Sequence, residues 1–115
     1  MAEKELNNVG NDDLIAEITD IISGYFEVYI DKHSFNYSRF VTHLQYLLKR
    51  QDQGVFIKSD NKEMYISMVK KFPRTNECVE QIAKFLKAQL DFELEQEEKL
   101  YLMLHVNRLC LRERL

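Results

Sequence analysis

The sequence predicts an all-α protein, a compact bundle of about five amphipathic helices packed as antiparallel pairs. Apolar residues recur at steps of three and four along most of the 115-residue chain, which is the spacing of one face of a helix. Three Gly and one Pro are too few for the many tight turns of a β-sandwich or barrel. Because 45% of the residues are apolar, one domain of this length can form a core without disulfide bonds or metal ions.

Residues 1–11 show no useful periodicity, and we expect them to form a polar tail or linker before a domain at residues 12–115. The first helix is predicted to begin where Asn11 or Asp12 caps it, because a short side-chain oxygen accepts a hydrogen bond from a free first-turn N–H. Its apolar stripe comprises Leu14, Ile18, Ile21, Ile22, Tyr25, Phe26 and Tyr29.

The second helix is predicted from about Asn36 to about Gln51. A loop follows at residues 53–55, where Gly54 is free to take a positive φ. The stripe of this helix comprises Tyr37, Phe40, Val41, Leu44, Leu47 and Leu48.

A third helix is predicted to begin at Ser59 or Asp60, since Asp60 and Glu63 have the spacing of a capping box. Pro73 is expected to end this helix, because proline disfavours helical geometry in the residue before it. Its apolar members are Met64, Ile66, Met68, Val69 and Phe72.

The fourth helix is predicted to open at Thr75 or Asn76, and the fifth to run from about Leu94 to Arg112. The fifth helix begins in an acidic stretch and ends in a basic one, which complements the helix dipole at both ends. The stripe of the fourth helix comprises Cys78, Val79, Ile82, Phe85, Leu86 and Leu90.

Charge and composition argue against several classes of function. A net charge of −3 gives no basic field, so we expect no direct contact with nucleic acid. No apolar run approaches the ~20 residues of a membrane helix and no signal peptide opens the chain, so a cytoplasmic location away from the membrane is expected. Cys78 and Cys110, without any CxxC motif, are expected to be buried thiols rather than zinc ligands. No cofactor or metal is predicted.

Three histidines are the candidate functional residues. His33 lies in a polar link between the first two helices and is expected to be solvated. His43 lies in the middle of the second helix, with Arg39 four residues before it and Arg50 seven residues after it. These spacings place His43 and both arginines on one helix face.

His105 repeats this arrangement in the fifth helix, where Arg108 follows it by three residues. A neutral imidazole is a good nucleophile near pH 7, because its ordinary pKa is ~6.5. An arginine can hold a phosphoryl group through two parallel hydrogen bonds, so each pair is a candidate phosphoryl acceptor. The spacing alone also allows a histidine hydrogen-bonded at a helix–helix seam, with the arginine bridging to nearby carboxylates.

The common catalytic motifs are absent from the sequence. It contains no Gly-rich phosphate loop, no HExxH and no GxSxG. Glu97 and Glu98 are adjacent and therefore point about 100° apart on a helix, which fits first-turn charges better than an acid/base pair. The chain is not expected to be an enzyme.

Two longer motifs resemble those of a known family. Residues 36–50, NYSRFVTHLQYLLKR, resemble the first histidine motif of a phosphotransferase-system (PTS) regulation domain, and residues 101–109, YLMLHVNRL, resemble the second. The resemblance covers about residues 12–112 and is nearest to the second such domain of BglG/SacY-type transcriptional antiterminators. Both motifs together are far more specific than either histidine alone.

This resemblance implies a regulatory domain that the sugar phosphotransferase system phosphorylates on His43 and His105. In the family, the histidine phosphocarrier protein HPr and a sugar permease component donate the phosphoryl groups, and phosphorylation shifts the packing of a homodimer. The spacing adds Arg39, Arg50 and Arg108 as candidate charge partners. We expect the chain to be a piece of a longer protein, in which a separate N-terminal domain binds RNA.

Three alternatives stay open at this point. The same type of domain occurs in DNA-binding transcriptional activators. A helical protein-interaction module with purely structural histidines would share the helical pattern. A small helical enzyme that passes a phosphoryl group through histidine is the third alternative, although no substrate pocket can be identified from the sequence.

Overall fold

The computed structural model describes the backbone of residues 2–52 and 61–114 and the side chains of residues 11–50 and 61–110. Within these ranges the chain forms five helices and no strand, which confirms the all-α prediction. None of these helices combines the length and apolar character needed to cross a membrane. The helices are α1 (Ala2–Phe26), α2 (Phe35–Asp52), α3 (Lys62–Lys71), α4 (Pro73–Leu90) and α5 (Gln96–Arg114).

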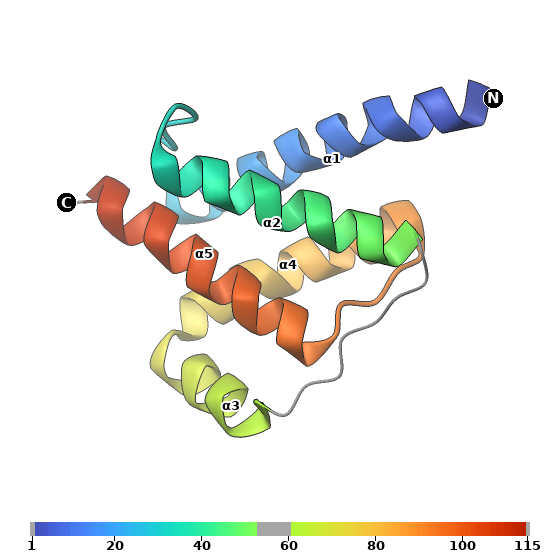
Figure 1. The fold of residues 1–115 in the computed structure, drawn as a ribbon. Coiled ribbons are helices and arrows are strands. Elements are labelled where there is room, and N and C mark those ends of the chain that lie inside the picture. The colour runs from blue at the N-terminus through green and yellow to red at the C-terminus, as the bar shows by residue number, and fades with distance from the viewer. Residues whose placement is uncertain (1, 53–60, 115) are drawn as a thin grey trace.

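Helix α5 holds the bundle together, because it packs against α2, α3 and α4 (Figure 1). Helix α1 packs against α2 and α4 on the other side. Consecutive long helices run in opposite directions, α1 against α2 and α4 against α5 (Figure 1). This arrangement lays the middle of α2 alongside the middle of α5, where each of the two helices carries a histidine.

The core is built from the apolar stripes that the sequence predicts. In α2 the side chains at steps of three and four, Phe40, Leu44 and Leu47, are fully buried. They pack in one cluster with the stripes of the other long helices. Members of this cluster with no exposed surface also include Ile18, Ile22, Cys78, Val79, Ile82, Leu86, Leu102, Met103 and Val106.

Two side-chain hydrogen bonds fix the long helices relative to one another. Thr19 of α1 is buried and its Oγ1 lies 3.0 Å from the phenol oxygen of Tyr37 on α2. Thr75 of α4 is also buried and donates a hydrogen bond of 2.6 Å to the side-chain oxygen of Asn107 on α5. Each bond satisfies polar atoms that would otherwise be costly to bury at a helix seam.

The backbone of α1 begins at Ala2, so the prediction of a helix start at Asn11 or Asp12 is wrong. Residues 2–10 continue the helix through the segment that was expected to be a tail. Apolar periodicity indicates which residues are buried, whereas helix formation also depends on intrinsic propensity. The Ala, Glu, Lys and Leu residues of this segment favour the helix without supplying a readable stripe.

The predicted boundary between the third and fourth helices also changes. Helix α3 ends at Lys71, and Pro73 is the first residue of α4, where its missing N–H costs no helical hydrogen bond. The predicted start at Thr75 or Asn76 is therefore wrong, since both residues lie within the first turn. Phe72 is both the C-cap residue of α3 and the N-cap residue of α4.

The N-terminus of α3 is not capped by a side chain. Asn61 is the N-cap residue and makes no side-chain capping bond, and its amide nitrogen donates to Glu97 of α5. The predicted caps Ser59 and Asp60 and the predicted loop at 53–55 lie outside the described residues.

Replacing Phe40 with alanine tests the packing of α2. The Phe40→Ala variant is expected to lose about 3–5 kcal/mol in the free energy of unfolding, because it leaves a cavity at a fully buried site. Urea unfolding followed by circular dichroism measures the loss. Gln45→Ala, at an exposed position on the same helix, is the matched control and should change stability by less than about 0.5 kcal/mol. Equal effects of the two changes would contradict the packing.

Candidate functional site

His43 of α2 and His105 of α5 lie against each other. Their ring centroids are 4.9 Å apart and the ring planes differ by 33°. The ring of Tyr101, one turn before His105, meets His43 edge-on at 5.6 Å. The ring of Phe40, one turn before His43, lies 6.3 Å from His105. Two helices thus supply one ring cluster of Phe40, His43, Tyr101 and His105.

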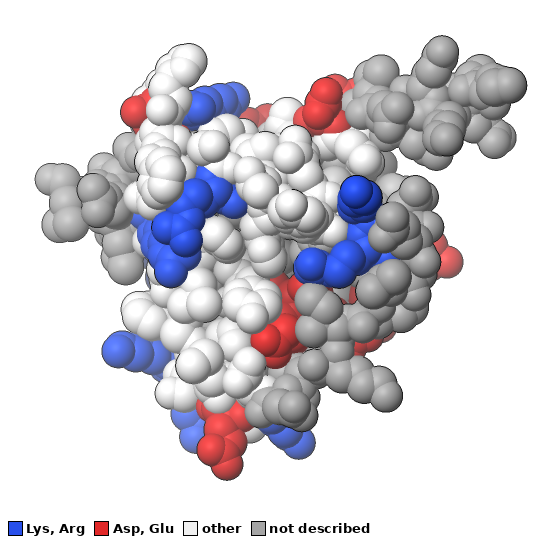
Figure 2. All heavy atoms as spheres, viewed as in Figure 1, with Lys and Arg blue, Asp and Glu red and all other residues white. Residues whose placement is uncertain are grey.

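Both histidines line a hollow of about 310 Å³ that opens to solvent. The other lining side chains bring three hydroxyl groups and one cation, from Ser38, Thr42, Tyr46 and Arg39. Figure 2 shows the face over α2 and α5, where Lys and Arg side chains gather in two groups over the two ends of α2. The surface between these groups is largely uncharged (Figure 2).

One ring nitrogen of this pair lacks a hydrogen bond. Nε2 of His43 is buried, and within the part of the chain that the structure describes it has no hydrogen-bond partner. A buried polar atom without a partner is unfavourable, and native proteins contain few of them. The seam alternative left open by the spacing includes a hydrogen-bonded histidine, which Nε2 of His43 does not provide among the described residues, and an arginine bridged to a carboxylate, which Arg50 provides with Glu98.

Burial lowers the pKa of both histidines. The pKa of His43 falls from 6.5 to about 4, mainly because burial disfavours the charged ring and secondly because of the positive charge of Arg50. The pKa of His105 falls to about 4 for the same first reason, with smaller contributions from His43, Arg108 and Arg39. At neutral pH both imidazoles are therefore uncharged, which is the nucleophilic form.

The structure places the three predicted arginines differently. Arg39 lines the hollow, and its guanidinium lies 5.6 Å from the ring centroid of the exposed Phe35. Arg50 is engaged elsewhere, since one of its terminal nitrogens donates to both carboxylate oxygens of Glu98 at 2.8 Å. Arg108 is exposed and acts on His105 through its charge.

The acidic pair at the start of α5 bridges three helices. Glu97 and Glu98 lie in the first turn, as predicted, but they are only 5% exposed, and sequence reasoning missed their partners. Glu98 binds Arg50 of α2, whereas Glu97 accepts a hydrogen bond of 3.0 Å from Asn61, at the start of α3. A hydrogen bond with Glu97 is also the main reason that the pKa of Tyr101 is raised. The spacing of four residues between Glu97 and Tyr101 is the signal that could have revealed this contact.

The remaining candidate residues lie away from the site. His33 is exposed, as predicted, and its backbone N–H donates to the side chain of Asp31. Cys78 and Cys110 are buried thiols, as predicted, and burial raises the pKa of Cys78 to about 12. Among the described residues no three His, Cys, Asp or Glu side chains gather to hold a metal ion.

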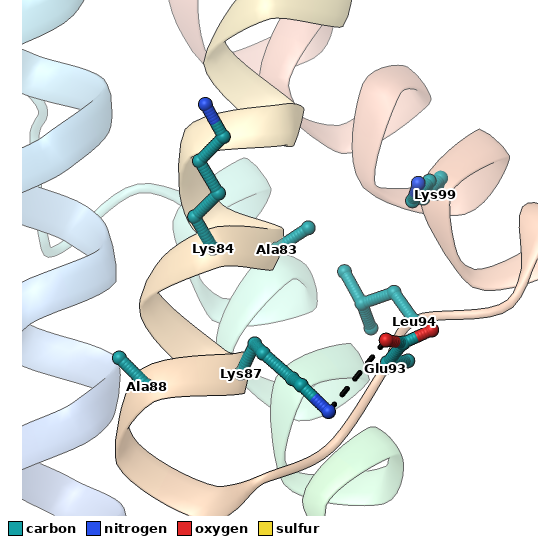
Figure 3. A pocket seen from close by; sticks show the side chains of 7 residues that line it. All are labelled: Ala83, Lys84, Lys87, Ala88, Glu93, Leu94 and Lys99. Atoms are coloured by element: carbon teal, nitrogen blue, oxygen red, sulfur yellow. Dashed lines mark ion pairs between the residues drawn. The ribbon is translucent and has the colours of Figure 1, made fainter.

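A second hollow, of about 390 Å³, lies between α4 and the segment before α5 (Figure 3). Its lysines are mostly paired with carboxylates: Lys87 with Asp91 and Glu93, and Lys99 with Glu80. It is larger than the hollow at the histidines, and among the described residues no histidine lines it. It is lined by Ala83, Lys84, Lys87, Ala88, Glu93, Leu94 and Lys99.

Comparison with known protein families places the chain in one of them. The family model of the PRD domain matches residues 16–109. The chain belongs to the PRD domain family. The matched residues contain α2, α3, α4 and most of α5, so the whole ring cluster lies within the match.

Relatives of this PRD domain include a transcription antiterminator. It is 28% identical over 106 residues to the transcription antiterminator LicT of Bacillus subtilis (strain 168). The aligned segment covers 91% of this chain and 38% of LicT. It is 32% identical over 95 residues to protein GlcT of a Staphylococcus epidermidis strain. The aligned segment covers 82% of this chain and 33% of GlcT. The PRD domain thus spans between a third and two fifths of the length of these relatives.

The lowered pKa values predict a specific dependence of stability on pH. The unfolded chain takes up protons on both histidines near pH 6.5, whereas the folded domain takes them up only near pH 4. The free energy of unfolding should therefore fall as the pH drops from 6.5 to 4. Urea titrations at fixed pH should show a shallower fall in the double variant His43→Gln/His105→Gln. If the double variant lost stability as steeply as the native domain between pH 6.5 and pH 4, the lowered pKa values of His43 and His105 would be contradicted. The His33→Gln variant is the control and should behave like the native domain.

The pair of Arg50 and Glu98 is expected to contribute to stability. The Glu98→Gln change removes the charge that faces a partly buried guanidinium, so the free energy of unfolding should fall by about 2 kcal/mol. Glu95→Gln, at an exposed position just before α5, is the matched control and should be nearly neutral. Thermal unfolding of both variants tests the contribution, and similar melting temperatures for the two would contradict it.

Proposed function

We propose that this PRD domain is the regulatory domain of a bacterial transcriptional antiterminator and accepts phosphoryl groups on His43 and His105. The donor is the phosphocarrier protein HPr of the sugar phosphotransferase system, with a sugar permease component as a second donor. Phosphorylation controls the packing of a homodimer, and through it the activity of an attached RNA-binding domain. The domain is the second of the two PRD domains in its parent protein and acts in the cytoplasm.

The observation that carries this proposal is the contact between the two histidines. Each ring is neutral at pH 7, because burial lowers its pKa to about 4, and a neutral ring offers a lone pair to a phosphorus atom. Both rings line a hollow that opens to solvent, so a donor can approach them. Helices α2 and α5 hold the rings rigidly, as transfer by positioning requires.

Arg39 supports the role of the hollow as a phosphoryl site. It is the cation that lines the hollow beside both histidines. A guanidinium can hold two oxygens of a phosphoryl group at once, and transfer of this group depends mainly on positioning and charge neutralisation. Arg50 is committed to Glu98 in this arrangement and contributes to the site through its charge.

Exposed aromatic side chains near the hollow support an interface between two copies of the domain. Phe35 is 75% exposed, Tyr46 is 58% exposed and Tyr101 is 38% exposed. Aromatic residues are enriched in the cores of protein interfaces. A phosphoryl group placed among these residues adds about −1.5 to −2 charges and so changes the preferred packing of a dimer.

The names of the relatives support the type of parent protein. The similar protein in Bacillus subtilis is a transcription antiterminator, and its similarity extends over 91% of this chain. Because this chain has a net charge of −3, we assign contact with RNA to another domain of the parent protein. In this proposal the domain is a substrate of phosphotransfer and not itself an enzyme.

A phosphotransfer assay tests the proposal. The purified domain is mixed with phosphoenolpyruvate, the general phosphotransferase enzyme and HPr, and the intact mass is read. The expected result is a gain of acid-labile phosphate. Each single variant, His43→Ala and His105→Ala, should reduce this gain, and the double variant should lose it completely. The exposed His33→Ala variant is the control and should keep the full gain.

Two results would contradict the proposal. Phosphate that persists in the double variant would mean that another residue is the acceptor. A folded domain that gains no phosphate from HPr or from a permease component would support a structural role for both histidines.

A further inference from the structure

The two histidines share one space, so a phosphoryl group on either of them lies beside the other. The ring centroids are 4.9 Å apart and the rings are tilted by only 33°. Both rings line the same hollow, and Nε2 of His43 has no hydrogen-bond partner among the described residues. Nothing in this geometry separates the two rings into independent sites.

The charged and titratable groups around the rings come from α2 and α5. Helix α2 supplies Arg39, which is exposed, and Arg50, which is bound to both oxygens of Glu98. Helix α5 supplies Arg108, which is exposed, and Tyr101, whose pKa is raised so that its phenol is neutral. Each imidazole therefore has the other imidazole as a ring neighbour, with 4.9 Å between the centroids.

We propose that the two histidines act as a pair, in which one carries the phosphoryl group and the other takes up a proton and becomes its counter-cation. This inference rests on the proposed function. It gives the second histidine a role even when it carries no phosphate, and it makes the two acceptors interdependent.

Phosphoryl transfer from the donor to one histidine of the pair conserves both charge and protons. A lone pair on a neutral ring nitrogen forms the new N–P bond, while the donor's N–P bond breaks and its electron pair returns to the donor imidazole. The acceptor ring then carries the phosphoryl group on one nitrogen and a proton on the other, with one positive charge. A proton moves from this ring to the neighbouring imidazole, which leaves a neutral phosphohistidine beside an imidazolium.

Electrostatics favours this second step. Without phosphate, burial and the nearby arginines hold the pKa of both rings near 4. A phosphoryl group brings about −1.5 to −2 charges, by analogy with phosphorylated hydroxyl groups. An opposite charge within ~4–6 Å shifts a pKa by about 1–3 toward the charged form. The pKa of the unphosphorylated ring should therefore rise from about 4 toward neutrality.

Nuclear magnetic resonance of the native chain tests the pair directly. The domain is labelled with 15N-histidine and phosphorylated with phosphoenolpyruvate, the general enzyme and HPr. The ring 15N shifts of the unphosphorylated histidine are then followed from pH 5.5 to pH 9. We expect its pKa to rise by about 2–3 relative to the unmodified domain. A phosphorylated domain whose second histidine stays neutral throughout would overturn the inference and leave the proposed function intact.

Intact mass separates this outcome from failure of the proposed function. If neither His43 nor His105 gains phosphate, the proposed function is wrong and the inference falls with it. His33 is exposed and lies away from the ring pair, so its signal reports the completeness of labelling in every sample.

Substitution of the second histidine provides a test by charge rescue. The equilibrium of phosphate between HPr and His43 is measured in His105→Gln and in His105→Lys, after circular dichroism has shown that both variants are folded. Loss of the counter-cation in His105→Gln should shift this equilibrium about tenfold toward HPr, and the fixed charge in His105→Lys should restore it. A merely structural role of His105 predicts equal effects of glutamine and lysine, and that result would overturn the inference.

Discussion

The packing of α2 against α5 is the constraint on which the site depends. Neither helix carries a complete site, because each brings one histidine and one further aromatic ring to the ring cluster. The buried stripe of Phe40, Leu44 and Leu47 sets the rotation of α2 about its axis, and this rotation turns His43 toward α5. A change in how these two helices pack would move the rings apart and open the hollow at the same time.

Burial has two linked effects at this seam. It keeps both imidazoles neutral, which prepares them as nucleophiles, and it leaves Nε2 of His43 without a hydrogen bond in the described part of the chain. The second effect is a cost in stability that the apolar core offsets. Glu97 and Glu98 secure the surrounding helices, since they bind Asn61 and Arg50 with buried carboxylates. The carboxylates that secure the bundle and the proposed phosphoryl acceptor His105 thus lie on the same helix, α5.

Sequence patterns located the helices better than their ends. Stripes at steps of three and four identified the buried face of α2, because the same side chains that create the pattern form the core. The start of α1 at Ala2 was missed, since the sequence of residues 2–10 has no apolar periodicity to detect. Pro73 was assigned to the end of one helix although it begins the next, because a proline fits both positions locally. Thr75 was predicted as a possible start of α4, whereas it lies inside that helix and bonds to Asn107, 32 residues away in sequence.

The sequence by itself determined the all-α class, the buried cysteines, the exposed His33 and the two motifs that contain the proposed acceptor histidines. These features depend on local periodicity and residue chemistry, which can be read directly from the order of the residues. Only the tertiary structure decided that the two histidine rings touch, that Arg39 borders the hollow, and that Arg50 is held by Glu98. Spacing along one helix defines a shared face, but the partner of that face is set by packing between helices that are distant in sequence.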